Sequence, residues 1–388
     1  MKNNEKVKVK NKVKGTSNFS FKNVNFQLLS VTIILVVFGL VMVYSASQYS
    51  AQMNYNNKYY FLIKQSIGAV VGLCAMIFAM NFDYHKLIKF KWWILAVSIV
   101  LLVLVFVPVI GVENYGAKRW INLGVTTIQS SEIAKFGFVV WCSAYLSKNY
   151  SKIKTFKGLL PILCFGGLIC LLIILEPNMS ITMCVGITMV VMLFVGGIRL
   201  KHFLLLAIPL IIAVPVLIII EPYRLARLTA FLNPWLNPKG EGYQLIQSLY
   251  GLGAGGLFGV GLFNSRQKYM FLPFAESDFI FSIIGEELGF FGCFILIGLF
   301  ALFIYNGIKI AINSKDRFGA FLSTGITTVI GVQVLINIAV VSGSIPPTGV
   351  PLPFISSGGT ALVVFMFCVG VLLNISKQNN ESINNNIR

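Results

Sequence analysis

The chain contains ten apolar stretches, each close to the roughly 20 residues that an α-helix needs to cross a bilayer. Hydrophobic residues make up 56% of the chain and charged residues only 11%, which excludes an ordinary soluble domain. Continuous apolar runs also exclude a transmembrane β-barrel, whose strands alternate. We therefore predict an all-α polytopic membrane protein with ten spans, at about 26–46, 61–81, 92–111, 131–147, 158–175, 181–197, 203–220, 279–305, 319–342 and 358–376.

The distribution of Lys and Arg over the loops predicts the orientation. Most of the 31 basic residues fall in the two tails and in the loops on their side of the membrane. The positive-inside rule then places both termini in the cytoplasm, and it places the long loop 221–278, between the seventh and eighth spans, outside. We expect residues 1–25 to form a disordered basic tail, 26–376 a single ten-helix domain and 377–388 a second cytoplasmic tail.

The net charge of +18 is explained by these loops and their contact with anionic lipid, so we predict no nucleic-acid partner. Of the 13 acidic residues, only Glu5, Asp83, Asp316 and Glu381 fall on the cytoplasmic side. Both histidines lie in cytoplasmic loops and all seven cysteines in predicted spans. This excludes a His/Cys metal site and a Ser-His-Asp triad on the outer face, so chemistry there must use carboxylates, cations and backbone amides.

The first outer segment places Lys118 and Arg119 directly before Trp120. Such a group suits an anionic, partly apolar ligand, although lipid phosphates and an interfacial tryptophan explain it equally well. Glu132 and Lys135 follow at the start of the next span. Their i, i+3 spacing allows a simple salt bridge, but ionisable residues at membrane depth generally serve function.

Two further outer segments contain prolines. Glu176 lies in a tight turn that Pro177 and small polar residues explain structurally, yet it is a candidate to orient a substrate or cation. A proline-rich segment, 343–360, ends in Ser356, Ser357 and Gly358 at the start of the last span. Backbone amides at a helix start can cradle a diphosphate, while a rigid connector is the structural alternative.

The long outer loop exceeds what a turn requires and is expected to be functional. A glycine run from Gly251 to Gly261 lets backbone amides approach a ligand closely. Arg266, Gln267 and Lys268 follow this run, and their two cations strengthen the interpretation as a phosphate site.

Asp278 is the sharpest candidate for a catalytic carboxylate. Capping of the helix that follows is its structural explanation. Beside Glu276 and within reach of cations, it would also serve as a base for a sugar hydroxyl. Glu286 and Glu287 lie roughly 12–14 Å deeper at about 1.5 Å per residue, which predicts a buried polar network that supports the site.

Taken together, these segments resemble the FtsW/RodA/SpoVE family, the SEDS proteins, over essentially residues 26–376. The resemblance is carried by Gly116–Ile121, Phe231–Trp235, Gly242–Gln244 with Gln247–Leu249, Gly255–Gly259, Asp278–Phe281 with Gly285–Gly289, and Thr348–Phe354. Ser265–Lys268 before Leu272 and Pro273 is more similar to the FtsW and SpoVE branch than to RodA.

The resemblance implies polymerisation of lipid II into β-1,4 glycan strands at the outer face of the bacterial cytoplasmic membrane, during division or sporulation. It places the family's essential aspartate on Asp278, and undecaprenyl diphosphate would be released. Lys118, Arg119, Arg266 and Lys268 are the candidates to offset the diphosphate charge. Expected partners are a class B penicillin-binding protein and other division or sporulation membrane proteins. No organic cofactor is implied, and a divalent cation, Mg²⁺ or Mn²⁺, is an open expectation.

Three residues depart from the family pattern: Ser130, Asn178 and Phe274 stand where the family usually has Pro, Asp and Glu. Two alternative functions are a lipid II flippase or other lipid transporter, and a non-enzymatic division scaffold. A transporter would place its charges near the membrane midplane, whereas these cluster at the outer face. A scaffold would not explain why polar residues gather in four separate outer loops.

Overall fold

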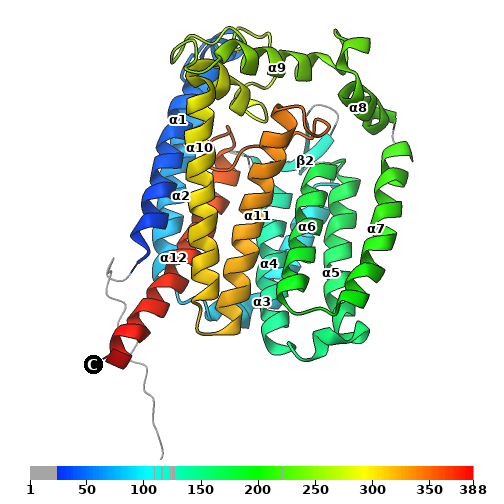
Figure 1. Cartoon of the computed structure of the whole chain (residues 1–388), viewed down its shortest axis with the longest axis vertical. Coiled ribbons are helices and arrows are strands. Elements are labelled where there is room, and N and C mark those ends of the chain that lie inside the picture. Colours follow the sequence, from blue (N-terminus) through cyan, green and yellow to red (C-terminus); the bar gives the residue numbers. More distant parts are fainter. Residues whose placement is uncertain are drawn as a thin grey trace, which may run out of the picture.

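The computed structural model describes residues 24–108, 110–114, 117–122, 124, 127–220 and 222–387. Each of the ten apolar stretches coincides with one helix, and these helices stand side by side (Figure 1). They are α1 (Phe26–Tyr55), α2 (Tyr60–Asn81), α3 (Lys86–Leu104), α4 (Ser130–Lys148), α5 (Phe156–Leu175), α6 (Met179–Val195), α7 (Leu200–Ile220), α10 (Ile280–Ile312), α11 (Arg317–Val341) and α12 (Gly359–Ile387).

The long loop between α7 and α10 is built from short elements at one end of the bundle (Figure 1). It contains α8 (Pro222–Leu232), a 3₁₀ turn (Pro234–Leu236) and α9 (Tyr243–Gly255). A second 3₁₀ turn, Lys152–Lys154, joins α4 to α5 at the other end. The loop is therefore a folded cap on the bundle and not a flexible connector.

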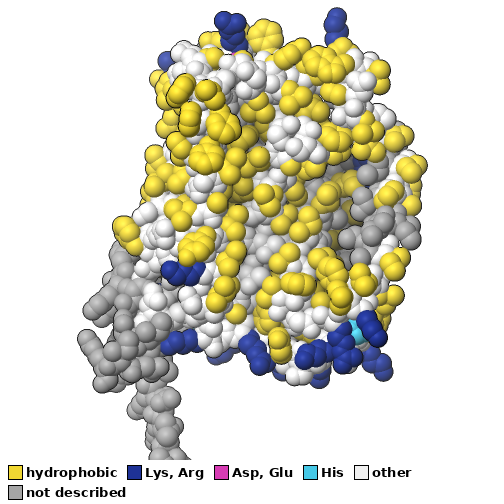
Figure 2. Space-filling view, viewed as in Figure 1, with side chains coloured by type: hydrophobic (Ala, Val, Ile, Leu, Met, Phe, Trp, Pro, Cys, Tyr) yellow, Lys and Arg dark blue, Asp and Glu magenta, His cyan; other side chains and the backbone are white. Residues whose placement is uncertain are grey.

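Helix length and surface composition make this a multi-pass membrane protein. Within the described residues, seven helices are long and apolar enough to cross a bilayer: α1, α2, α3, α5, α10, α11 and the part of α12 from Gly359 to Asn380. Helix α6 is a shorter apolar helix. Apolar side chains cover the flank of the bundle, and Lys and Arg gather mainly at the end away from α8 and α9 (Figure 2).

A small antiparallel sheet, which the sequence did not predict, is added to the mostly helical fold. Its strands are β1 (Gly111–Asn114), β2 (Ala117–Asn122) and β3 (Thr127–Gln129), in the order β1-β2-β3, with Trp120 paired to Gln129. Aromatic and β-branched residues such as Trp120, Ile121 and Ile128 favour strands over an irregular loop. The sheet satisfies the backbone of this segment by strand pairing.

Helix α10 is interrupted at Gly289, whose φ of 66° lies in the left-handed region. The glycine run packs into the interruption, where the Val260 amide donates to the Glu286 carbonyl (2.9 Å) and the Phe290 amide to the Gly256 carbonyl (2.9 Å). A Cβ on Gly289 would lie only 2.3 Å from the backbone nitrogen of Gly259. We predicted that these glycines admit a ligand. The structure shows that two of them, Gly255 and Gly259, admit the backbone of α10, because a Cβ there would lie 1.9 and 2.1 Å from the carbonyl oxygens of Gly285 and Glu287.

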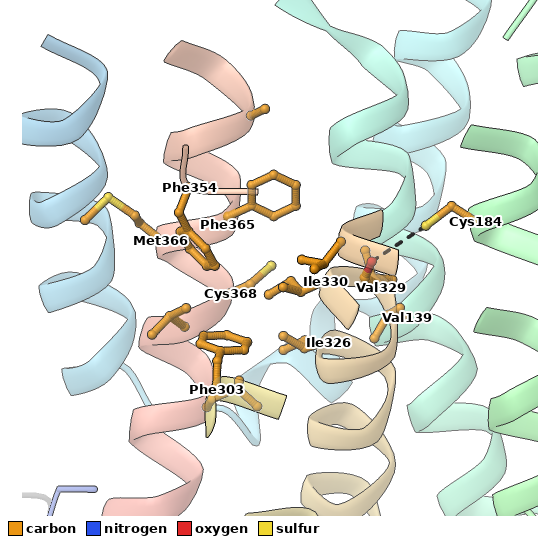
Figure 3. Packing of buried hydrophobic residues seen from close by; sticks show 14 of the residues in the cluster. Val139, Cys184, Phe303, Ile326, Val329, Ile330, Phe354, Phe365, Met366 and Cys368 are labelled. Atoms are coloured by element: carbon orange, nitrogen blue, oxygen red, sulfur yellow. Dashed lines mark hydrogen bonds between the residues drawn. The ribbon is translucent and has the colours of Figure 1, made fainter. Parts of the chain in front are cut away.

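The proline-rich segment is anchored in the core by Phe354. Its ring lies between Phe303 of α10 and Phe365 of α12, with ring centroids 5.5 and 5.8 Å away (Figure 3). On the α6 side of the same region, the Cys184 thiol contacts the Val329 carbonyl of α11 at 3.7 Å. Packing between α4, α6, α10, α11 and α12 thus fixes one side of the site described next.

Candidate active site

Asp278 lies two residues before the first residue of α10, Ile280, and is half-buried. The N-cap position of α10 is Phe279, with no side-chain capping bond, so capping does not explain Asp278. Its backbone carbonyl accepts a hydrogen bond of 2.7 Å from the side-chain amide of Asn337 on α11. The same amide donates to the Val350 carbonyl at 2.7 Å. Asn337 therefore ties Asp278 to the proline-rich segment.

The environment of Asp278 raises the pKa of its carboxyl to about 7. Burial is the main cause and Glu276 adds to it, while a hydrogen bond from its own backbone and the positive charges of Arg227 and Arg119 act in the opposite direction. Burial also raises the pKa of Glu276. A carboxyl with a pKa near neutrality suits proton transfer at physiological pH.

Ser356, Ser357 and Gly358 hold the segment around Asp278 in place. The Ser356 hydroxyl donates to the Ser277 carbonyl (2.5 Å), and the Ser357 amide donates to the Glu276 carbonyl (2.8 Å). The Gly358 amide donates to the side chain of Gln65 (3.0 Å). The Ser357 and Gly358 amides thus donate within the protein, and the diphosphate cradle stays a prediction.

A cavity of about 280 Å³ lies between β2, the α5–α6 turn, α8 and the proline-rich segment. Three arginines line it, together with an apolar wall: Arg119, Arg224, Arg227, Pro177, Asn178, Met179, Ser180, Met183, Leu228, Ile345, Pro346, Pro347 and Thr348. Asp278 is close to this wall, because a Cβ on Gly349, which follows Thr348, would lie 3.6 Å from its Oδ2.

Arg119 and Glu176, which the sequence placed in separate segments, meet at this cavity. The Arg119 guanidinium donates to the backbone carbonyls of Glu176 (3.3 Å) and Pro177. The Glu176 carboxyl is buried and accepts a hydrogen bond of 3.1 Å from Ser130. Burial raises its pKa to about 8, against the opposing effects of Ser130 and Arg119. The departure at Ser130 therefore supplies a hydrogen bond that a proline would lack.

The other residues of the first segment are divided between surface and interior. Lys118 is exposed and Trp120 is half-buried on β2. Glu132 and Lys135 form a buried ion pair in α4, with Nζ 2.8 Å from Oε1. Lys135 also donates to Gln333 of α11 (2.6 Å), and Gln333 donates to the Pro351 carbonyl (3.1 Å). This pair therefore reaches the proline-rich segment through α11.

Lys268, Glu286 and Glu287 lie in a different cluster, between α1, α10 and the loop after α9. Lys268 Nζ is 3.2 Å from Glu287 Oε1, and both side chains are fully buried. Ser45 of α1 donates to the same carboxylate at 2.6 Å. The structure thus engages Lys268 in an internal ion pair and does not bring it to the cavity; the diphosphate contact stays a prediction.

Glu286 binds the backbone of the segment that carries Arg266 and Gln267. The backbone amide of Arg266 donates to the Glu286 carboxylate at 2.9 Å, and the backbone amide of Gln267 donates to the same carboxylate at 3.3 Å. The Arg266 side chain is exposed, and neither it nor Gln267 lines the cavity. These two residues therefore belong to the same loop-holding network as Glu286.

Comparison with known proteins identifies the family of most of the chain. Residues 26–381 match the sequence model of the FtsW, RodA and SpoVE cell cycle proteins. The chain belongs to this family. It is 41% identical to the stage V sporulation protein E of Bacillus subtilis, over 90% of this chain and 96% of that protein. It is 38% identical to a probable peptidoglycan glycosyltransferase FtsW of Geobacter sp. strain M18, over 90% of this chain and 95% of that one.

Solved structures of the family share the fold. A chain from a peptidoglycan synthase complex that coordinates polymerization and crosslinking aligns with a TM-score of 0.77 at 26% identity, over 92% of this chain and 98% of that one. The rod shape determining protein RodA of Thermus thermophilus aligns with a TM-score of 0.69 at 23% identity, over the same shares of the two chains. The helical arrangement of this FtsW/RodA/SpoVE member is thus that of known membrane proteins.

Sequence reasoning missed four polar residues that shape the site. Arg224 and Arg227 of α8 were read only as charges of the outer loop, although their i, i+3 spacing puts them on one helix face. Gln333 and Asn337 are likewise one turn apart on α11. Amide side chains inside an apolar helix are a signal that could have identified these two.

Proposed function

We propose that this chain is a peptidoglycan glycosyltransferase that joins lipid II units into β-1,4 glycan strands and releases undecaprenyl diphosphate. The observation that carries the proposal is a carboxyl of near-neutral pKa, Asp278, beside a cavity lined by three arginines. A base and a cationic site next to each other are what glycosyl transfer from a diphosphate requires. The names of the relatives, SpoVE and peptidoglycan glycosyltransferase FtsW, support this reaction.

In the proposed reaction, Asp278 accepts the proton of the 4-hydroxyl of the acceptor GlcNAc. The oxygen attacks C1 of the donor MurNAc and forms the new C1–O bond with inversion. The old bond from C1 to the phosphate oxygen breaks, and its electron pair goes to the diphosphate. Arg119 at the cavity offsets the charge that develops there.

We propose ten spans, with both termini in the cytoplasm and the α8–α9 cap on the outer face of the bacterial cytoplasmic membrane. Helices α4, α6 and α7 stand alongside the seven clear candidates and are similar in direction (Figure 1). The concentration of Lys and Arg at the end away from the cap supports this orientation (Figure 2). The site would then face the side on which the cell wall is built.

A class B penicillin-binding protein is the proposed partner, because a synthase complex that couples polymerization to crosslinking contains a chain of this fold. Similarity to both SpoVE and FtsW supports a place in sporulation or in division, with the other membrane proteins of that process. Within the described residues, no group of three or more His, Cys, Asp and Glu side chains could hold a metal ion. A divalent cation would therefore bind through Asp278 or Glu276 together with substrate phosphates.

A lipid II transporter is the alternative that the buried Glu132–Lys135 pair favours. The experiment that separates the two is incubation of lipid II in detergent with the purified chain and its transpeptidase, followed by electrophoresis of the products. Detergent removes the two membrane compartments, so a transporter or a scaffold yields no glycan strands. Strands formed without any other polymerase support the proposed function.

A further inference from the structure

A buried side-chain amide of α2 contacts the loop that lies against Asp278. Gln65 is only 2% exposed, although most of α2 is apolar. Its Nε2 donates to the Ser356 carbonyl at 3.0 Å, and its Oε1 accepts from the Gly358 amide at 3.0 Å. The opposite orientation of the amide would place donor against donor and acceptor against acceptor, so both bonds require this one. Gln65 therefore forms a two-point clamp around Ser357.

Glycines bring two helices close enough to the loop for this clamp. A Cβ on Gly68, three residues after Gln65 on α2, would lie 2.9 Å from the Cα of Gly359. On the α1 side, a Cβ on Gly39 would lie 2.5 Å from the Phe354 carbonyl oxygen. The loop backbone is thus held between α1 and α2. Removal of the Gln65 amide would leave buried backbone groups of this loop without partners.

The clamped loop binds the backbone directly before Asp278. The Ser356 hydroxyl donates to the Ser277 carbonyl (2.5 Å). The Ser357 amide donates to the Glu276 carbonyl (2.8 Å). The two residues that precede Asp278 are therefore each fixed by a residue of the clamped loop.

A second clamp of the same chemistry joins α2 and α12 at the opposite end of α2. There, the side-chain amide of Asn374 on α12 donates to the Met80 carbonyl (2.7 Å) and accepts from the Tyr84 amide (3.1 Å). Met80 is roughly 22 Å from Gln65 along α2, at about 1.5 Å per residue. The two clamps thus form a matched pair, of which one leads to Asp278 and the other to the far end of the bundle.

We propose that Gln65 is a positioning residue, which acts through Ser356 and Ser357 to fix the place where Asp278 meets the acceptor hydroxyl. This inference rests on the proposed function. A base accepts a proton only within hydrogen-bond reach, and a displacement of about 1 Å can lower the rate by about 100-fold. Because Gln65 is buried and acts through the backbone, loss of the clamp affects the chemical step more than the affinity for lipid II.

The inference is tested by steady-state polymerisation of lipid II with the full chain copurified with its transpeptidase. Gln65→Met keeps the length of the side chain and removes both hydrogen bonds, so kcat should fall about 10–100-fold with KM nearly unchanged. Asn374→Leu is the matched control and should retain a native-like kcat. Equal losses of kcat in the two variants would overturn the inference, as would a native-like kcat in Gln65→Met.

A second substitution covers the case in which Gln65→Met does not fold. The amide of Gln65→Asn is one carbon shorter and does not span both bonds, but the position stays polar. The same loss of kcat at nearly unchanged KM is expected. A native-like kcat in Gln65→Asn, or a rise in KM alone, would overturn the inference.

A cycle of double variants tests the path through the loop. Ser356→Ala removes the bond to the Ser277 carbonyl. Effects of independent residues on kcat multiply, whereas effects of residues that act in series do not. Gln65→Met combined with Ser356→Ala should therefore lose less kcat than the product of the two single losses. Full multiplication would contradict the path from Gln65 through Ser356.

Backbone hydrogen exchange separates the inference from the proposed function, because it requires no activity. In Gln65→Met, the peptide that covers residues 274–280 should exchange at least about tenfold faster than in the native protein, and in Asn374→Leu at the native rate. Unchanged exchange in Gln65→Met would overturn the inference even if the native chain polymerises lipid II. Absence of polymer from the native chain would overturn the proposed function, while exchange still shows whether the clamp holds the segment that carries Asp278.

Discussion

The side-chain amide of Asn337 donates a hydrogen bond of 2.7 Å to the backbone carbonyl of Asp278, a residue 59 positions earlier. A second bond of 2.7 Å from the same amide reaches Val350. One turn earlier on α11, Gln333 joins the buried Lys135 to Pro351. Two side-chain amides of α11 thus hold the segment that carries Asp278 and the proline-rich segment against each other.

Asn337→Ala should lower kcat by about 10–100-fold while changing KM little, because Asp278 loses its anchor and not its charge. Steady-state polymerisation of lipid II checks this. Asn306→Ala is the matched control, since Asn306 is equally buried and bonded, to Asn25 and Leu302, far from the cavity. Equal losses of kcat in both variants would show that Asn337 is only structural.

The rate of polymerisation should rise with pH through about 7 and level off above it, because Asp278 accepts a proton only when ionised. A pH–rate profile at saturating lipid II measures this. A profile that is flat between pH 5 and 9 would contradict a base of this pKa.

The same carboxyl should make the folded protein less stable at alkaline pH. A raised folded pKa means that the native state binds this proton more tightly than the unfolded chain, so stability is lost as pH rises from about 4 to about 7. Asp278→Asn should therefore melt at a higher temperature than the native protein at pH 8, and the difference should shrink at pH 5. Thermal unfolding in detergent tests the sign, and a lower melting temperature at pH 8 would contradict it.

Lys268→Met should destabilise the protein by about 3–5 kcal/mol, because Glu287 would remain as an uncompensated buried charge. The double variant Lys268→Met with Glu287→Met should recover most of this loss. Lys239→Met, at an exposed position, is the control. If Lys268→Met were stable but formed no glycan strands from lipid II, Lys268 would have to be returned to the substrate site.

Gly289→Ala should destabilise the protein by more than about 1–2 kcal/mol, since φ is 66° and the new Cβ would collide with the backbone of Gly259. Gly298 offers a matched control on the same helix, because its Cβ would meet nothing within 4 Å. Gly298→Ala should leave stability unchanged or raise it slightly. Comparable melting temperatures for the two variants would refute the packing of the glycine run into α10.

Much of the fold can be predicted from the sequence, because an apolar run of this length satisfies its backbone hydrogen bonds in lipid only as a helix. Every predicted stretch contains a helix, and polar residues extend several of them, as from 46 to Tyr55 in α1. The stretch predicted at 92–111 differs in the other direction, because α3 ends at Leu104. The sheet was missed because residues 111–129 border a membrane, where charged and aromatic residues read as an interfacial loop. Six residues of β2 are too few for a clear alternation.

The site was predicted less completely, because it depends on which segments meet. The sequence singled out Asp278, Glu276 and Arg119, and in the structure the charges of Glu276 and Arg119 act on Asp278. Lys268 was assigned to the diphosphate because a linear sequence does not reveal that Glu287, 19 residues later, lies 3.2 Å away. Arg224 was overlooked because a charge on an amphipathic helix ordinarily faces solvent, whereas α8 turns it into the cavity.

The most direct test of the central claim is glycan-strand formation from purified lipid II by this chain copurified with its transpeptidase, compared with Asp278→Asn. The substitution keeps the size of the side chain and the backbone carbonyl that Asn337 holds, but it removes the basic carboxylate. We predict strands from the native chain and a loss of polymer below detection from Asp278→Asn. Equal polymer from both proteins would contradict the assignment of Asp278 as the base.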